Sequence, residues 1–158
     1  MSATRDTTNQ SRDLLVDTSG RALVRKVDAS GADFGTNTET AALVTLTAAT
    51  AGGNSADQTN LGARGLLLGI NITAITGTAP TLTVTVQGKD AVSGVYYTLL
   101  QSVVLSAAAF TLLTVYPGVT AAANVAASQA LPRTYRVLYA IGGTTPAVTA
   151  TIGASLIV

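Results

Sequence analysis

The chain has 158 residues, a formal net charge of +1 and 47% hydrophobic residues, and it contains neither cysteine nor histidine. The missing cysteine excludes disulfides and thiolate metal sites, and the missing histidine removes the commonest general base and metal ligand. A net charge so close to zero argues against nucleic-acid binding through a positive field. We therefore expect no enzymatic activity, no cofactor, no metal site and no nucleic-acid partner.

Residues 1–40 are polar, and we interpret them as an extended N-terminal arm. They hold eleven of the seventeen charged residues, and such a stretch buries too little apolar surface to offset the entropy of ordering it. Its short apolar runs, Leu14–Val16 and Ala22–Val24, can add a strand to a sheet or dock in a groove. Arg21, Arg25 and Lys26 are candidate contacts to acidic groups of a partner. No signal peptide begins the sequence, and no apolar run is long enough to span a bilayer, so we expect no membrane association.

Residues 41–158 are predicted to form one all-β domain, best supported over 60–158. Residues 81–87 alternate strictly between threonine or glutamine and an aliphatic residue, and residues 133–141 alternate again, which is typical of strands with one buried face. Residues 50–60 and 88–94 have the composition of loops, and the alanine-rich stretch 119–130 is predicted to be an extended loop or a short helical turn. The other predicted strands are 41–48, 66–76, 95–105, 110–116 and 147–158.

Two short phrases of the sequence repeat each other. Residues 77–85 and 143–151 share the pattern Gly-Thr-x-Pro followed by a threonine-faced strand. Each Gly-Thr-x-Pro is predicted to be a turn, which gives two equivalent hairpins. Short strands separated by turns at this spacing indicate an antiparallel β-sandwich or jelly roll.

Few motifs in the sequence point to chemistry. The glycine pairs have no lysine at P-loop spacing, and the N-terminal aspartates do not match a calcium loop. Arg133 and Arg136 are rare charges in an apolar domain; they either protect the strand and keep it soluble, or they pair with an acidic residue of a neighbour. The five tyrosines could stack on sugars, but without tryptophan or paired carboxylates they are better explained as core-edge or interface residues.

Three phrases of the C-terminal part resemble a family of small phage and prophage virion proteins: Ile70–Lys89, Leu113–Gly118 and Leu131–Pro146. The resemblance covers about residues 60–158. It implies a β-sandwich of jelly-roll type, often trimeric, that sits on capsids as a decoration (cement) subunit or serves as a minor head or tail component. The N-terminal 60 residues do not carry it, so the mode of attachment stays open.

These observations predict a structural virion protein that is assembled in a bacterial cytoplasm. The expected partners are the major capsid protein or other virion proteins and further copies of the chain, with a trimer as the expected oligomer, since an apolar domain with so few charges indicates interfaces. A tail or head-fibre subunit is the structural alternative. A carbohydrate-binding adhesion module is the alternative from another class. The candidate interface residues are Arg21, Arg25, Lys26, Arg133 and Arg136.

Overall fold

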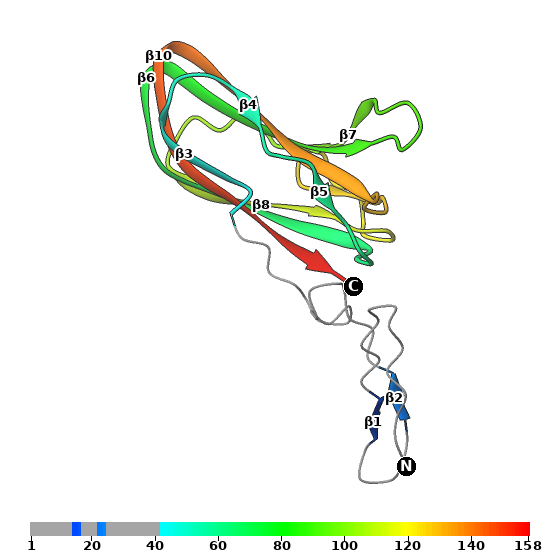
Figure 1. Ribbon diagram of the computed structural model, residues 1–158. Coiled ribbons are helices and arrows are strands. Elements are labelled where there is room, and N and C mark those ends of the chain that lie inside the picture. Colours follow the sequence, from blue (N-terminus) through cyan, green and yellow to red (C-terminus); the bar gives the residue numbers. More distant parts are fainter. Residues whose placement is uncertain (1–13, 17–21, 25–41) are drawn as a thin grey trace. The chain divides into compact units, whose positions relative to one another are not determined.

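The computed structural model describes residues 14–16, 22–24 and 42–158, and within them it is all-β (Figure 1). The chain divides into two units, at residues 36 and 37, which are described separately. In the first unit, β1 (Leu14–Val16) and β2 (Ala22–Val24) pair with each other as an antiparallel hairpin. Arg21, Arg25 and Lys26 lie outside the described residues, as does most of the predicted arm.

The second unit is built around two very long strands. β6 (Gly65–Lys89) and β10 (Thr134–Ile157) pair antiparallel along nearly their whole length. Six shorter strands join them in one eight-stranded sheet: β3 (Val44–Ala49), β4 (Gly53–Asn54), β5 (Gln58–Thr59), β7 (Tyr96–Gln101), β8 (Ala109–Val115) and β9 (Ala126–Ala127).

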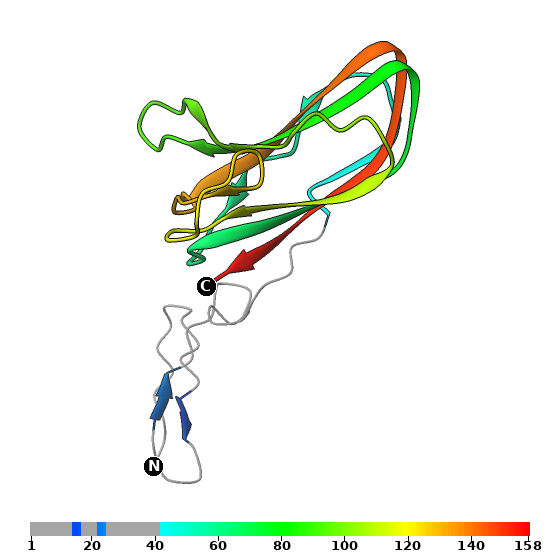
Figure 2. The same cartoon turned by 180° about the vertical axis from the view of Figure 1, so that it is seen from behind.

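The paired long strands bend near their middle, so that their two halves face each other as two layers (Figures 1 and 2). Layer 1 contains the first half of β6 and the second half of β10, flanked by β8 and β3. Layer 2 contains the other two halves, flanked by β7 on β6 and by β4 and β5 on β10. Every pairing in the described part is antiparallel except the short parallel contact between β8 and β9, so the sheet is mixed.

The chain of the second unit repeats one order of elements twice, and each repeat contributes strands to both layers. The first repeat is β3, then β4 and β5, then the long β6; the second is β7, then β8, then the long β10, with the short β9 inserted before β10 without a counterpart. β3 pairs with the second half of β10, as β7 pairs with the second half of β6. β4 and β5 pair with the first half of β10, as β8 pairs with the first half of β6. The repeat that the sequence shows in two short phrases therefore extends, in structure, over the whole domain.

The two Gly-Thr-x-Pro phrases were predicted to be hairpin turns, and this prediction is wrong. Both phrases lie inside the long strands at the bend, and Thr78 pairs with Thr144. A Cβ on Gly77 would lie 2.7 Å from the carbonyl oxygen of Thr145, and a Cβ on Gly143 would lie 2.6 Å from that of Ala79. Each glycine also has a positive φ, of 121° and 107°. Both positions therefore require glycine for two reasons: the positive φ, and the close approach of the facing strand's backbone at the bend.

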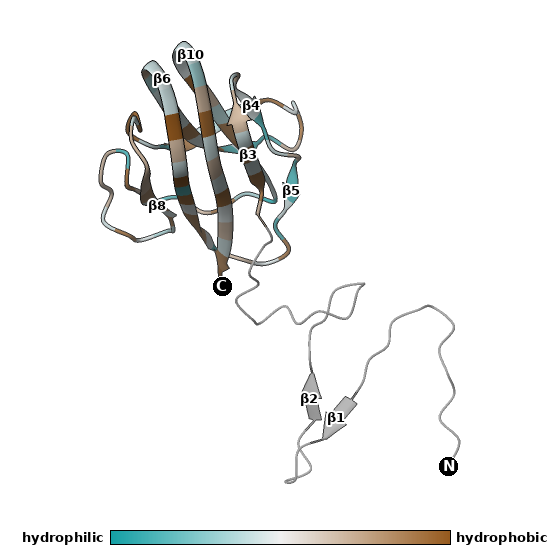
Figure 3. Ribbon diagram, turned by 90° about the vertical axis from the view of Figure 1, so that its left-hand side faces the viewer, coloured by the Kyte–Doolittle hydropathy of each residue, from teal (hydrophilic) through white to brown (hydrophobic). Residues whose placement is uncertain are grey.

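The core lies between the layers and is aliphatic. The predicted inward faces are confirmed: Leu82, Val84 and Val86 are fully buried, and so are Tyr135 and Val137. Figure 3 shows the resulting alternation of apolar and polar residues along β6 and β10. The side chains that fill layer 1 from the inside include Leu66, Leu68, Ile70, Ile72, Leu113, Val115, Val148 and Ile152.

Aromatic rings cover glycines on neighbouring strands, which is how a chain with few aromatic residues uses them. A Cβ on Gly88 would lie 2.6 Å from the ring of Tyr97, and a Cβ on Gly65 would lie 2.5 Å from the ring of Tyr116. Tyr139 covers Gly53 in the same way, with its hydroxyl 2.6 Å from that Cβ position. Such cross-strand pairs protect the glycine backbone and fix the register of the strands.

Residues 50–60, predicted to be a loop, contain the two short strands β4 and β5. Between them, the side chain of Ser55 takes the place of a backbone acceptor: its hydroxyl accepts a hydrogen bond from the amide of Val137 at 3.0 Å. Ser102, at the end of β7, does the same for the amide of Val84 at 3.0 Å. Both serines are buried, and these bonds satisfy backbone groups at the two sides of layer 2.

Candidate interaction surfaces

The outer faces of the two layers differ in charge. The strand segments of layer 1, over residues 44–49, 65–76, 109–115 and 147–157, contain no charged residue. In the described part of the chain, charged side chains within strands are found only in layer 2, as Lys89 and Arg136, and Asp57 lies between β4 and β5. The domain therefore presents one uncharged face and one face with a network of ions.

The charged network lies across β6, β7 and β10. The Lys89 Nζ donates to Asp57 Oδ2 at 2.8 Å, and the Tyr96 hydroxyl donates to Asp57 Oδ1 at 2.6 Å. The guanidinium carbon of Arg136 lies 3.4 Å from the centroid of the Tyr96 ring. Its Nε donates to Gln87 Oε1 at 2.9 Å. The network thus ties neighbouring strands together through cation–π contact and hydrogen bonds.

The structure separates the two arginines of the candidate interface. Arg133 is exposed and precedes the first residue of β10. Arg136 lies on the outer face of layer 2, half-buried, and is held within the chain by Tyr96 and Gln87. Arg136 lies between the buried Tyr135 and Val137, so it is on the opposite, outward side of β10. A contact of either with a partner stays a prediction.

The tyrosines are not gathered on one platform. Tyr135 is in the core, and Tyr139 is half-buried and packs against the core. Tyr96 belongs to the charged network, and Tyr97 covers Gly88. The structure thus uses at least these rings for packing between strands, as the sequence favoured over a sugar-stacking site.

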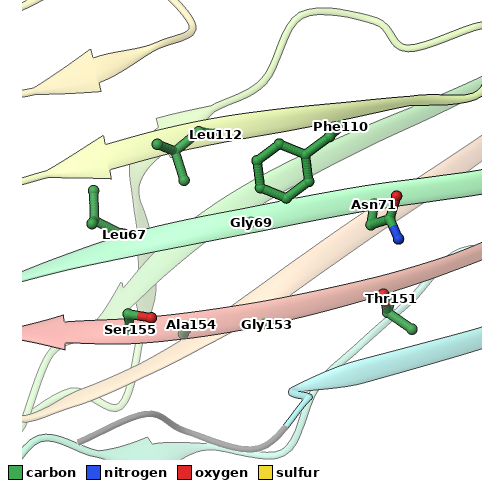
Figure 4. Close-up of a pocket in the computed structure, with 9 residues that line it drawn as sticks. All are labelled: Leu67, Gly69, Asn71, Phe110, Leu112, Thr151, Gly153, Ala154 and Ser155. Atoms are coloured by element: carbon green, nitrogen blue, oxygen red, sulfur yellow. The ribbon is translucent and has the colours of Figure 1, made fainter. Parts of the chain in front are cut away.

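The uncharged face carries an open hollow, about 360 Å³ in volume, that the sequence analysis missed (Figure 4). Gly69 of β6 and Gly153 of β10 are directly paired at its floor. Phe110 and Leu112 of β8 stand at its rim and are 66% and 45% exposed. The alternation of Leu67, Gly69 and Asn71 on the outer side of β6 was the available signal, but it indicates a surface only once the neighbouring strands are known.

The floor of this hollow is covered on one side and open on the other. The Phe110 ring leans over Gly69, where a Cβ would lie 3.2 Å from its ring atoms Cε2 and Cζ. A Cβ on Gly153 would meet nothing within 4 Å, so that side of the floor is open. Large exposed apolar side chains beside an unfilled hollow are typical of contact surfaces.

In the described ranges, no group of three or more carboxylate, histidine or cysteine side chains is placed to hold a metal ion. No helix in the same ranges is long and apolar enough to cross a membrane. Comparison of the chain with protein-family models, with curated proteins and with solved structures finds no match. The proposals below therefore rest on the sequence and the geometry.

The hydrogen bonds to Asp57 give a titration that can be measured. The bonds from Lys89 and then Tyr96 lower the pKa of the Asp57 carboxyl below its usual 3.8. Because the pKa is lower in the folded state, the bonds stabilise the fold above the unfolded pKa, and this stabilisation is lost as the pH falls through the folded pKa. In a carbon-detected NMR titration we expect Asp57 to titrate below 3.8 and Lys89→Met to raise its pKa.

Asp90 is the internal control for this titration. Ser93 hydrogen bonds lower the pKa of the Asp90 carboxyl, through the side chain and the backbone of Ser93. Lys89→Met should leave that titration where it is. If Asp57 and Asp90 shift together, the substitution has changed the fold or the net field, and the assignment of the Asp57 pKa to the Lys89 contact is wrong.

Proposed function

We propose that this chain is a non-enzymatic structural subunit of a bacteriophage virion, with a β-sandwich domain of jelly-roll type that decorates and stabilises the head shell. The observation that supports this most is the uncharged outer face of layer 1, with Phe110 and Leu112 exposed on it. Burying such a face costs little polar desolvation, which suits a subunit that works by contact with neighbours. The resemblance of residues 60–158 to small virion proteins points the same way.

The mechanism is mechanical. A subunit that contacts two capsid proteins resists their separation, and small contact energies repeated over a shell add up to a large resistance to internal pressure. The partners are the major capsid protein or other virion proteins, and further copies of the chain. A tail or head-fibre position would use the same surfaces in another part of the particle.

Location of the chain in particles tests the proposal directly. Particles from the phage or prophage that encodes the chain would be purified and labelled with an antibody raised against residues 42–158. We expect label on the head surface and loss of resistance to heat or osmotic shock in particles that lack the chain. Label confined to tails would support the alternative position, and absence from particles would overturn the virion role.

The polar arm is expected to serve attachment more than folding. Residues 1–40 hold eleven of the seventeen charges, whereas the described strands of the second unit share a large aliphatic core. Deleting residues 1–40 should lower the melting temperature by no more than a few degrees, within the roughly 2–4 °C that about 1 kcal/mol shifts a domain of this size. Co-sedimentation of the truncated chain with undecorated capsids should be strongly weakened.

A set of variants that remove positive charges separates the arm's contribution from that of the domain. Replacing Arg21, Arg25 and Lys26 together by glutamine should weaken binding and reduce its sensitivity to salt, because exposed ion pairs are screened. The control is Arg64→Gln, which removes a charge from an exposed position of the domain that is not among the candidate interface residues. A truncated chain that binds capsids with full affinity would show that the domain alone is the attachment device.

A further inference from the structure

Arg136 is held in one orientation on the outer face of layer 2. Its guanidinium carbon lies 3.4 Å from the centroid of the Tyr96 ring, a separation at which the guanidinium stacks flat on the ring. Its Nε donates a hydrogen bond to Gln87 Oε1 at 2.9 Å. The contact with the ring fixes the plane of the guanidinium, and the hydrogen bond fixes its direction within that plane.

The ring on which Arg136 stacks is itself held in place. The Tyr96 hydroxyl donates to Asp57 Oδ1 at 2.6 Å, and Lys89 Nζ donates to Asp57 Oδ2 at 2.8 Å. Both oxygens of Asp57 are therefore occupied, and Lys89 balances its charge. Because these side chains are already ordered, a ligand that binds Arg136 loses little free energy in ordering them.

The charge of Arg136 has no carboxylate partner within the described residues. Lys89 and Asp57 form the ion pair on this face, and no carboxylate of the described part lies within ion-pair distance of Arg136. Because Nε is bonded to Gln87, the free edge of the guanidinium consists of the terminal nitrogens Nη1 and Nη2. This edge carries N–H donors at a half-buried position and finds no acceptor among the same residues.

The ligand that fits this edge is a carboxylate. Two parallel N–H groups of a guanidinium match the two oxygens of a carboxylate, and such bidentate pairs are stronger and more directional than ordinary hydrogen bonds. A phosphate offers similar oxygens but carries more negative charge. Asp57, which is bonded to the same Tyr96 side chain, repels the more highly charged anion more strongly. The site therefore favours a carboxylate over a phosphate.

We propose that Arg136, stacked on Tyr96 and bonded to Gln87, is a preformed binding site for a carboxylate side chain of a partner protein. This deepens the proposed function, on which it rests only for the identity of the partner as a virion protein. It also distinguishes the two arginines of the candidate interface. Arg133 is exposed, and its side chain makes no hydrogen bond or ion pair within the described residues, so it is not preformed in this way.

An NMR titration of the full-length chain with sodium acetate tests the site without a partner protein. The Nε–H signals of the arginines are followed at an ionic strength kept constant with sodium chloride, and Arg136→Lys assigns the Arg136 signal by its loss. We expect this signal to shift saturably, with a dissociation constant of about 10–100 mM, as for a single charge-assisted pair in water. Arg133 is the reference in the same sample, and its signal should not saturate.

A substitution at Gln87 blocks the site from within the chain. Gln87→Glu has the same shape and supplies a carboxylate beside Arg136, so it should weaken acetate binding about tenfold or more. The matched control is Gln101→Glu, which makes the same chemical change at an exposed position of β7 and should leave acetate binding within about twofold. Both variants should keep the circular dichroism spectrum of the wild type.

Three results of the titration would overturn the proposal. They are an Arg136 signal that does not saturate below about 0.5 M acetate, parallel shifts of the Arg133 and Arg136 signals, and tighter binding of inorganic phosphate than of acetate. Equal effects of Gln87→Glu and Gln101→Glu would overturn it as well, because the loss would then follow from net charge. None of these results depends on whether the chain is found in particles.

Co-sedimentation with undecorated capsids then tests the biological setting. Arg136→Lys should weaken binding about tenfold, because lysine cannot form the bidentate pair, whereas Arg133→Lys should leave it unchanged. If the wild-type chain and Arg136→Lys bind capsids equally well, the proposed carboxylate contact is wrong and the virion role stands. If acetate binds as expected and the chain is absent from particles, the virion role is wrong and the carboxylate site stands.

Discussion

Replacing Gly143 by alanine is expected to lower the free energy of unfolding by about 3 kcal/mol or more, because strain and backbone overlap add at this position. The glycine has a φ of 107°. A Cβ there would lie 2.6 Å from the carbonyl oxygen of Ala79 and 2.9 Å from the Cα of Pro80. Both atoms belong to the backbone of the facing phrase, so neither can move aside without opening the bend.

Two further glycines allow the effect of the backbone contact to be separated from that of the positive φ. Gly77→Ala should cost as much as Gly143→Ala, because its Cβ would meet the backbone of Thr145 and Pro146 in the equivalent way. Gly118 also has a positive φ, of 91°, but a Cβ there meets nothing within 4 Å, so Gly118→Ala should cost only the conformational strain, about 1 kcal/mol. Thermal or urea unfolding of the three variants measures the series. Equal losses at Gly118 and Gly143 would show that φ alone matters and that the facing phrases do not press on each other.

Asn60→Asp is expected to destabilise the domain by about 3 kcal/mol at neutral pH, because it buries an unpaired charge against carbonyl oxygens. The Asn60 Nδ2 donates to the carbonyls of Ala63 at 2.8 Å and Leu131 at 3.0 Å. Its Oδ1 accepts from the amides of Gly62 at 3.0 Å and Ala63 at 2.8 Å. The residue is 8% exposed, so little water can reach these groups to replace the partners.

The pH dependence of this variant has a definite sign. Burial and the two carbonyls would raise the folded pKa of the introduced carboxyl above its unfolded value. Its cost is therefore absent below the unfolded pKa, where the group is protonated in both states, and grows as the pH rises toward the folded pKa. Urea unfolding at pH 3 and pH 7 would measure it. The control is Asn54→Asp at an exposed position, where the loss should be small at both pH values. A loss at position 60 that does not depend on pH would contradict this assignment.

Local patterns in the sequence predicted the strands well and their connections poorly. The alternation in residues 81–87 and 133–141 identified the buried faces, because a period of two is a property of the strand itself. The same kind of reasoning read Gly77–Pro80 and Gly143–Pro146 as turns, because glycine with positive φ and proline are what a turn needs. At the bend, these residues instead allow two facing strands to approach closely while both curve. The pairing that brings them together joins Thr78 to Thr144, 66 positions apart in the sequence.

The candidate surfaces were predictable only in part. The scarcity of charge in residues 65–158 indicated contact surfaces, and a contact of Arg133 or Arg136 with a partner stays a prediction. The hollow was not predicted, because Gly69, Phe110 and Gly153 come from three strands whose order in the sheet is not written in any one segment. β4 and β5 were missed for a similar reason: their residues have loop composition, and only their bonds to β10 make them strands.

The position of β10 has a consequence for how the protein is made. β10 follows β3, β4, β5 and β6 in the chain and pairs with all four, so neither layer can close before it is synthesised. A ribosome adds about 5–20 residues per second, whereas sheets with distant pairings fold in milliseconds to seconds once the strands are present. For seconds the nascent chain therefore exposes the uncharged strands of layer 1 without a partner, and we expect it to depend on chaperones until β10 emerges.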